Sequence, residues 1–467
     1  MAKTWKQSIL QHGIPFPSTG LTCLEGHLPT ELQGTLYQNG PGRLTRGGLR
    51  VGHWFDGDGA VLAVKIKDGQ AIATYRYVET EQFLAEEKAN TFLYSGYGTH
   101  AAGNWLNRFR STKNVANTSV LPLDDRLLAL WEGGLPHALD RQTLEMLGVD
   151  SLALPASGTY SAHPKRDGVT GEIFNFGVNF GQQTSLNLYR SSPNGQIKKQ
   201  NRIPLCGIPL IHDFVLAGSY LIFCVSPVQL SFLPLILRQK TLSEAMTWRP
   251  ELGTEIILCD RDRLEVCGRF QCEPWYQWHF GNGAEQPDGT IAFDLVRYSD
   301  FSTNEFLREV ATGETQTISP CQYWRYHVDP QAKRLLDSYP ILPQQCEFPV
   351  VRSQEVGQPW QQTYLLVHRP GVDASMGELF GALACLDHAT GAVEIANCGE
   401  DSYPGEPIYA PDQKSPDQGW ILTVVYNGQA HSSEVWVYES VNFSEPVCRL
   451  GLPQVIPPSF HGKWQSG

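Results

Sequence analysis

The chain has 467 residues, with 36 Lys+Arg against 48 Asp+Glu and a formal net charge of −12 at pH 7. This negative balance gives no electrostatic reason to bind nucleic acid, and no stretch approaches the ~20 apolar residues that a membrane-spanning helix needs. The eleven cysteines include no C-x-x-C pair, and the first eleven residues lack the apolar core of a signal peptide. We therefore expect free thiols and a cytoplasmic protein.

Short segments rich in β-branched and aromatic residues run through the whole chain and are typical of strands. Asn-Gly and Asp-Gly turn pairs recur between them. Many short strands without a break in composition favour a propeller or a large barrel over several separate domains. We predict one all-β domain over residues 1–467, and its clearest strands are 61–67, 72–78, 363–367, 420–426 and 434–438.

Helical patterns are confined to short pieces, of which the clearest are 80–89 and 237–248. The most apolar stretch, Leu230–Leu237, comes directly before Arg238 and Lys240. One interpretation is a buried strand or a loop packed on the core. The other is an exposed apolar patch that rests in a membrane surface, which suits an enzyme that extracts a water-insoluble substrate. Residues 228–238 are therefore our prediction for peripheral membrane contact.

Four of the thirteen histidines stand out by the residues around them. They are His163 in Tyr160-Ser-Ala-His-Pro-Lys165, His212 in Ile211-His-Asp-Phe214, His279 in Trp278-His-Phe-Gly-Asn282 and His461 in Ser459-Phe-His-Gly-Lys463. A lone histidine is more often a structural or surface residue than a metal ligand. These four are separated by 49, 67 and 182 residues, so a shared metal would require separate structural units to converge. A propeller provides this convergence, because the inner strand of each blade faces a common axis.

At these residues the chain resembles the carotenoid cleavage oxygenase family, and most of all its bacterial and cyanobacterial apocarotenoid oxygenases. The likeness covers nearly the whole chain, and its further motifs follow in order: Leu36-Tyr-Gln-Asn-Gly-Pro-Gly42, His53-Trp-Phe-Asp-Gly-Asp-Gly59, Asn114-Val-Ala-Asn-Thr-Ser119, Leu128-Ala-Leu-Trp-Glu-Gly-Gly134 and Gly405-Glu-Pro-Ile-Tyr-Ala-Pro411. The resemblance implies a seven-bladed β-propeller with a small helical and loop cap over the metal face. It also implies one Fe(II) ion, held by His163, His212, His279 and His461.

In this family, three ligand histidines each hydrogen-bond a glutamate, and the matching residues here are Glu132, Glu347 and Glu406. A neutral imidazole binds metal through one nitrogen and offers its other N–H to an acceptor. A carboxylate in that place fixes the tautomer and makes the ligand more basic. Four imidazoles add no charge, so the glutamates also offset the dication. Taken alone, each glutamate would be an ordinary surface carboxylate.

The resemblance further implies an apolar cavity beside the metal. We expect the following residues to face the substrate and the oxygen: Phe55, Thr118, Trp131, Trp278, Tyr298 and Phe348. Aromatic faces pack well against a rigid polyene, and core packing is the alternative role for each of them. Thr118 matches the family threonine whose methyl group lies beside the open metal position. Trp131 stands where stilbene-cleaving relatives carry a lysine, which favours a carotenoid or apocarotenoid over a hydroxystilbene.

These features together predict an Fe(II)-dependent dioxygenase. It would use O₂ to cleave one C=C bond of an apocarotenoid or carotenoid into two carbonyl products, retinal-type aldehydes, and we nominate no catalytic acid or base. The sequence has no GxGxxG after a strand, no Walker A loop and no Fe–S cysteine cluster. Three alternatives stay open: cleavage of a stilbenoid within the same family, a propeller that only binds a ligand or partner, and a glycoside-hydrolase propeller with a carboxylate pair across its funnel.

Overall fold

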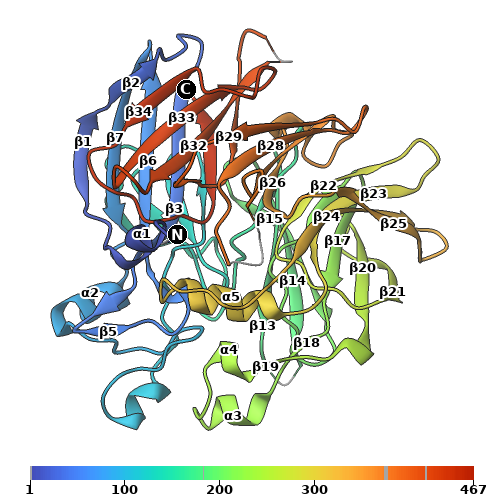
Figure 1. Ribbon diagram of the computed structural model, residues 1–467. Helices are drawn as coiled ribbons and strands as arrows, with labels where there is room; N and C mark the ends of the chain where they lie inside the picture. The colour runs from blue at the N-terminus through green and yellow to red at the C-terminus, as the bar shows by residue number, and fades with distance from the viewer. Residues whose placement is uncertain (1–2, 182, 373–376, 416–417) are drawn as a thin grey trace.

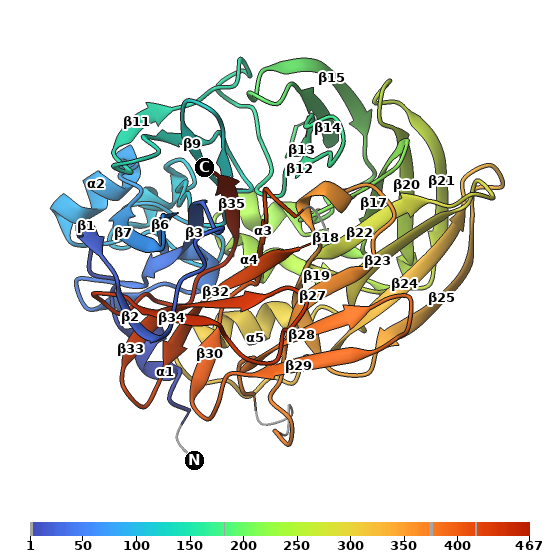
Figure 2. The same ribbon diagram turned by 90° about the horizontal axis from the view of Figure 1, so that it is seen from above.

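The computed structural model describes residues 3–181, 183–372, 377–415 and 418–467. Its strands form sheets that stand around a common centre, which gives an all-β, propeller-like fold (Figures 1 and 2). The prediction of an all-β propeller fold is confirmed. None of the helices in these ranges has the length and apolar character that crossing a membrane requires.

Strands from the beginning and the end of the chain pair with each other in two neighbouring sheets. One sheet has the order β1-β7-β6-β3-β35, so the last strand pairs with a strand from the beginning of the chain. A second sheet has the order β2-β34-β33-β32-β30, with β31 also paired to β32. The strands of these two sheets are β1 (Phe16–Gly20), β2 (Thr22–Gly26), β3 (Gly34–Arg43), β6 (Asp58–Lys67), β7 (Gln70–Tyr77), β30 (Ser402–Pro404), β31 (Ile408–Pro411), β32 (Gly419–Asn427), β33 (Ser432–Glu439), β34 (Cys448–Gly451) and β35 (Gly462–Ser466).

Three four-stranded antiparallel sheets occupy other positions around the centre. The first contains β8 (Ser119–Pro122), β9 (Leu127–Leu130), β10 (His137–Leu139) and β11 (Met146–Val149). The second contains β12 (Lys165–Arg166), β13 (Ile173–Asn179), β14 (Ser185–Ser191) and β15 (Ile197–Pro204). The third contains β26 (Cys346–Val350), β27 (Gln362–Val367), β28 (Ala382–Asp387) and β29 (Val393–Asn397).

An eight-stranded sheet with the order β21-β20-β17-β16-β22-β23-β24-β25 completes the ring. A single parallel pair, Ala217↔Gly283, joins its two halves. Its strands are β16 (Val215–Ala217), β17 (Tyr220–Val225), β20 (Thr254–Asp260), β21 (Val266–Cys272), β22 (Phe280–Glu285), β23 (Ile291–Tyr298), β24 (Cys321–Asp329) and β25 (Arg334–Leu342). Two short hairpins stand apart: β4 (Thr45–Arg46) with β5 (Leu49–Arg50), and β18 (Val228–Leu230) with β19 (Met246–Trp248).

The hydrophobic core consists of apolar layers between neighbouring sheets. In one such layer Leu36 and Leu62 pack with Leu422 and Val435 of the adjoining sheet, and all four are fully buried. Burying a side chain of this size contributes about 1.5–3 kcal/mol relative to leaving it in water. Four of the five predicted strands lie within β6, β27, β32 and β33, and the fifth, 72–78, lies within β7 except for its last residue, Val78.

Helices are few and short: α1 (Lys6–Leu10), α2 (Glu81–Ala89), α3 (Phe232–Ile236), α4 (Leu242–Ala245) and α5 (Ser302–Val310), with 3₁₀ turns η1 (Trp54–Asp56), η2 (Trp105–Phe109), η3 (Pro250–Leu252) and η4 (Ser353–Glu355). The predicted helix 80–89 is confirmed as α2, whose Thr80 hydroxyl caps it by accepting the Phe83 N–H at 3.0 Å. In Figure 1, α2, α3, α4 and α5 lie along the lower part of the molecule.

The prediction of a helix over 237–248 is wrong in most of its length. Only Leu242–Ala245 is helical, and it starts at a capping box between Thr241 and Glu244. Met246–Trp248 pairs with Val228–Leu230 instead, so a tertiary strand pairing overrides the local pattern. Most of the apolar stretch Leu230–Leu237 is not a buried strand either, because α3 occupies Phe232–Ile236 and only Leu230 belongs to β18.

Candidate metal centre and cavity

The four singled-out histidines stand directly before inner strands of the sheets. His163 precedes β12 by two residues and His212 precedes β16 by three, while His279 and His461 come immediately before β22 and β35. Their candidate ligand nitrogens all lie within 4.8 Å of one another. The starts of four inner strands thus bring together side chains that are far apart in the sequence.

The distances between the imidazole nitrogens fit a shared metal ion. His163 Nε2 lies 3.0 Å from His212 Nε2, and His279 Nε2 lies 3.1 Å from His461 Nε2. Two nitrogens bound at about 2.1 Å and at a right angle to each other would be about 3.0 Å apart. Each close pair therefore has the spacing of two adjacent ligands around one cation.

Hydrogen bonds to carboxylates orient two of the histidines. His279 Nδ1 donates to Glu347 Oε2 at 2.6 Å, and His461 Nδ1 donates to Glu406 Oε1 at 2.9 Å. An ionised carboxylate only accepts, so each ring carries a proton on Nδ1, and in the neutral form of the ring Nε2 keeps a lone pair. Burial lowers the pKa of His279, but the Glu347 carboxylate outweighs it and raises this pKa above its ordinary value, whereas burial lowers the pKa of His461. When both rings are neutral, two lone pairs face each other across 3.1 Å, and a cation between them would remove their repulsion.

Both glutamates are themselves held in place. Glu347 also accepts from the Tyr298 hydroxyl at 2.7 Å and from the Phe348 N–H at 2.9 Å. Burial by itself raises the pKa of Glu347, but His279 and these donors bring it below its ordinary value. Glu406 accepts the Gly462 N–H at 2.7 Å. The carboxylates are thus fixed acceptors rather than mobile surface groups.

Glu132 is placed differently from the other two predicted glutamates. Its Oε1 lies 3.4 Å from His212 Nδ1 and 3.9 Å from His163 Nε2, and this atom accepts no hydrogen bond from the described residues. Burial raises the pKa of Glu132 well above its ordinary value, and the Asp213 carboxylate raises it further. The expected histidine–glutamate hydrogen bond is therefore present at two of the three positions, and at the third the carboxylate only stands beside His212.

The remaining two histidines are neutral. Burial lowers the pKa of His163 and of His212 well below the ordinary value, and the neighbouring imidazoles lower both further. The neutral form is the one that binds a metal, because its unprotonated nitrogen keeps a lone pair. The donor set is therefore four imidazole nitrogens, which suit a divalent transition metal.

Three of the four histidines, His212, His279 and His461, form part of the wall of a cavity of about 670 Å³. All six residues predicted to face the substrate and oxygen lie on this wall: Phe55, Thr118, Trp131, Trp278, Tyr298 and Phe348. The Trp278 ring meets the His212 ring edge-on at 4.9 Å, and its indole N–H donates to the Thr303 hydroxyl at 2.9 Å. Such contacts hold flat apolar surfaces in fixed orientations beside the candidate metal ligands.

Two of these wall residues are placed by close local contacts. The Thr118 carbonyl accepts the His461 N–H at 3.1 Å, so this residue supports a ligand through its backbone. The Trp131 ring folds over Gly133, where an added Cβ would lie 2.7 Å from the ring. A larger residue at position 133 would therefore push Trp131 off its present place on the wall.

The structure also shows features of the wall that the sequence did not reveal. Phe348 sits in a bulge of β26 with φ +53°, a strained value for an aromatic residue, and its ring stacks on His279 at 5.1 Å and 26°. Phe460 lies on the wall as well, with its ring edge-on to Phe55 at 5.6 Å. Its position directly before His461 was the available signal for its role.

Three comparisons with known proteins place these features in context. The family described as retinal pigment epithelial membrane protein matches residues 12–466. Apocarotenoid-15,15'-oxygenase of Synechocystis sp. is 32% identical over 457 residues, which cover 94% of this chain and 92% of the relative. Resveratrol cleavage oxygenase 1 of Aspergillus fumigatus is 30% identical over 464 residues, which cover 95% and 91%. The solved structure of the cobalt-substituted apocarotenoid oxygenase of Synechocystis superposes with a TM-score of 0.90 at 30% identity, covering 99% of each chain.

Proposed function

The chain belongs to the retinal pigment epithelial membrane protein family, which includes the carotenoid cleavage oxygenases, and we propose that it is an Fe(II)-dependent dioxygenase of apocarotenoids. It cleaves one C=C bond with O₂ and releases two carbonyl products, of which one is a retinal-type aldehyde. The reaction balances without a reductant, because both atoms of O₂ end in the products. The observation that carries this proposal is the pair of 3.0 and 3.1 Å nitrogen–nitrogen spacings in a histidine cluster of which three members line an apolar cavity.

The four histidines would hold Fe(II), which supplies O₂ activation when bound. Glu347 and Glu406 keep His279 and His461 in the tautomer that presents Nε2 to the metal. Their negative charges also offset the charge of the dication inside the protein. No side chain is needed as an acid or base, since the bond cleavage transfers no proton.

The apolar wall binds the polyene, excludes water and places one double bond beside the histidine cluster. Phe55, Trp278 and Phe348 supply flat surfaces for this, and they lie within contact range of the ligand rings or of one another. Trp131 brings a second apolar face to the wall. A stilbenoid is the alternative substrate, supported by the identity to a resveratrol cleavage oxygenase, and Trp131 argues against it because it has no ammonium group for a phenol.

We further propose that the protein docks on a membrane surface through the segment around residues 228–238. Apolar side chains on two segments are each at least 50% exposed: Leu233, Ile236 and Leu237 at α3, and Trp105, Leu106 and Phe109 at η2. The Arg108 guanidinium donates to the Arg238 carbonyl at 3.4 Å and so joins the two segments. Leu235 and Arg238 also line the cavity, so a polyene would pass from lipid to cavity beside α3, at the lower edge of Figure 1.

Three further expectations, on the number of blades, the domain organisation and the location of the protein, complete the proposal. The eight-stranded sheet, divided at its single parallel bridge, would count as two blades, which gives a seven-bladed propeller with α3, α4 and α5 as its cap. The chain would act as one domain over residues 1–467, in the cytoplasm.

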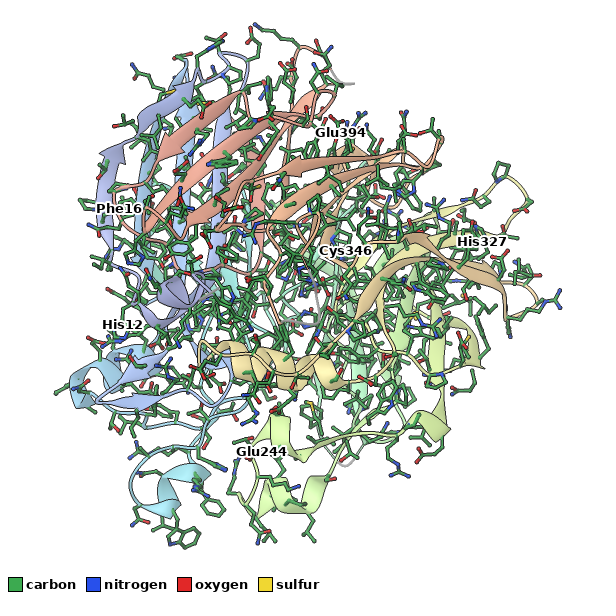
Figure 3. All side chains as sticks on the ribbon, viewed as in Figure 1. His12, Phe16, Glu244, His327, Cys346 and Glu394 are labelled. Carbon is green, nitrogen blue, oxygen red and sulfur yellow. The ribbon has the colours of Figure 1, made fainter. Side chains whose placement is uncertain are left out.

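The experiment that tests the function is anaerobic Fe(II) loading followed by an aerobic assay with a C30-range apocarotenal and, separately, with resveratrol. We expect aldehydes from the apocarotenal and loss of this activity in His279→Ala. His327→Ala is the matched control, because His327 pairs with Asp337 near the rim of the molecule (Figure 3). Cleavage of resveratrol alone would replace the substrate assignment, and turnover that survives in His279→Ala would refute the metal centre.

A further inference from the structure

Two cysteine side chains from opposite ends of the chain touch each other at the edge of one sheet. Cys23 lies in β2 and Cys448 in β34, and their Sγ atoms are 3.8 Å apart although 425 positions separate the two residues in the sequence. Both are free thiols. Neither residue lies on the cavity wall or belongs to the histidine cluster, so the proposed oxygenase reaction gives this contact no role.

The strand pairing places both side chains on one face of the sheet. β2 and β34 are antiparallel, and Cys23 stands opposite Leu450. Cys448 comes two residues before Leu450, so its side chain emerges on the same face and lies diagonally across from Cys23. The register shifts between Cys23 and Glu25, which marks a bulge in the ladder beside the first cysteine.

The two thiols differ in their access to water. Cys23 is exposed, as is every residue of β2, whereas Cys448 is only 1% exposed. Burial raises the pKa of Cys448 to about 12, and its contact with the Cys23 thiol adds to this rise, so Cys448 stays protonated. An oxidant in solution therefore meets Cys23 first. An accessible thiol with a second thiol directly beside it is the arrangement expected of a redox-sensitive pair.

Only a small movement separates this contact from a covalent bond. A disulfide bond is about 2.05 Å long, so the sulfur atoms would approach each other by about 1.8 Å. β2 is the edge strand of its sheet, and the described residues pair it with β34 alone. The Cys23 thiol now donates to two carbonyls of its own strand, of Glu25 at 3.4 Å and of Gly26 at 3.3 Å. A thiol is a weak donor, so turning its sulfur toward Cys448 gives up little.

We propose that Cys23 and Cys448 are an oxidative modification site, at which hydrogen peroxide forms a reversible disulfide between β2 and β34. This inference goes beyond the proposed function and does not depend on it. The Cys23 thiolate attacks the peroxide, the O–O bond breaks, and a sulfenic acid forms as hydroxide leaves. The Cys448 sulfur then attacks Cys23 Sγ, the S–O bond breaks, and water leaves. In sum, two thiols and one peroxide give one disulfide and two water molecules.

The disulfide would fasten a segment that connects two neighbouring sheets. β1 pairs with β7 in one sheet, and β2, which follows after Leu21, pairs with β34 in the other. Figures 1 and 2 both show β2 beside β34 at one side of the molecule. A cross-link between residues so far apart in the sequence limits the freedom of the unfolded chain. Thiol reductants of a reducing compartment would reverse it.

The test exposes the reduced full-length chain to hydrogen peroxide with a chelator present, and then alkylates the remaining thiols under denaturing conditions. We expect the protein to lose two of its eleven thiols. A protease digest should yield one linked pair of peptides that contains Cys23 and Cys448, and dithiothreitol should restore both thiols. The Tm of the oxidised protein should exceed that of the reduced protein.

Three variants assign the effect to this pair. Cys206→Ser is the matched control, because Cys206 is the other exposed cysteine and contacts no second thiol among the described residues, and it should form the disulfide as the wild type does. Cys23→Ser should yield no linked peptides and no rise in Tm. In Cys448→Ala, the sulfenic acid of Cys23 should persist and react with dimedone.

Three results would overturn the proposal. The first is oxidation of Cys23 to a sulfinic acid while the Cys448 thiol remains intact. The second is a disulfide through Cys23 between two copies of the chain, and the third is no loss of thiols at all.

Discussion

Replacing Glu347 by Gln tests whether a carboxylate stabilises the metal-binding form of His279. Glu347 accepts from His279 Nδ1 at 2.6 Å, from Tyr298 at 2.7 Å and from the Phe348 N–H at 2.9 Å. Gln has nearly the same shape, so it can keep an oxygen toward His279 while its NH₂ group faces the Tyr298 hydroxyl. The substitution therefore removes the negative charge and changes the packing little.

The expected size of the effect follows from these contacts. A short, buried hydrogen bond to a charged group contributes about 1.5–3 kcal/mol, and outer partners of metal ligands typically change metal affinity by about 10–100-fold. We expect Glu347→Gln to weaken Fe(II) binding by about that factor in an anaerobic titration against a chelating indicator. Tyr298→Phe keeps the charge and loses one hydrogen bond, so its effect should be smaller. Fe(II) affinity of Glu347→Gln within twofold of wild type would refute the reasoning.

Three further predictions concern stability, substrate choice and membrane contact. Lys113→Met should lower the free energy of unfolding by about 1.5–3 kcal/mol in urea titrations, because Asp58 and Glu86 lose one of the two buried cations that contact both, while Arg46 remains beside them; a loss below about 0.5 kcal/mol would contradict this. Trp131→Lys should raise resveratrol turnover relative to the apocarotenal, and an unchanged ratio would remove our argument from this position. Leu233→Asp should reduce flotation of the protein with neutral phospholipid vesicles, since the net charge of −12 leaves apolar insertion as the attractive force; unchanged flotation would exclude α3 as the contact.

Much of the fold follows from local sequence patterns. The strands at 61–67 and 420–426 are predictable because β-branched and aromatic runs bounded by turn pairs fit a sheet that is covered on both sides. The segment 237–248 shows the limit of such reasoning. Its last three residues join a hairpin with Val228–Leu230, and that pairing depends on residues outside any local window.

The site required more than local patterns. Nothing in the spacing of 49, 67 and 182 residues tells which histidines meet, and it was the motif order along the chain that pointed to four that lie within 4.8 Å. The bulge that aims Phe348 at His279 and the looser placement of Glu132 could not be read from the sequence. Both depend on backbone geometry that strand alternation does not determine.

The most direct test of the metal centre is X-ray absorption at the iron edge of the anaerobically loaded protein. We predict one Fe(II) per chain, with four imidazole nitrogens at about 2.1 Å, the usual metal–histidine distance. His461→Ala should lose one of these four scatterers. A first coordination sphere made mainly of carboxylate oxygens, or no iron retained after desalting, would contradict the four-histidine centre.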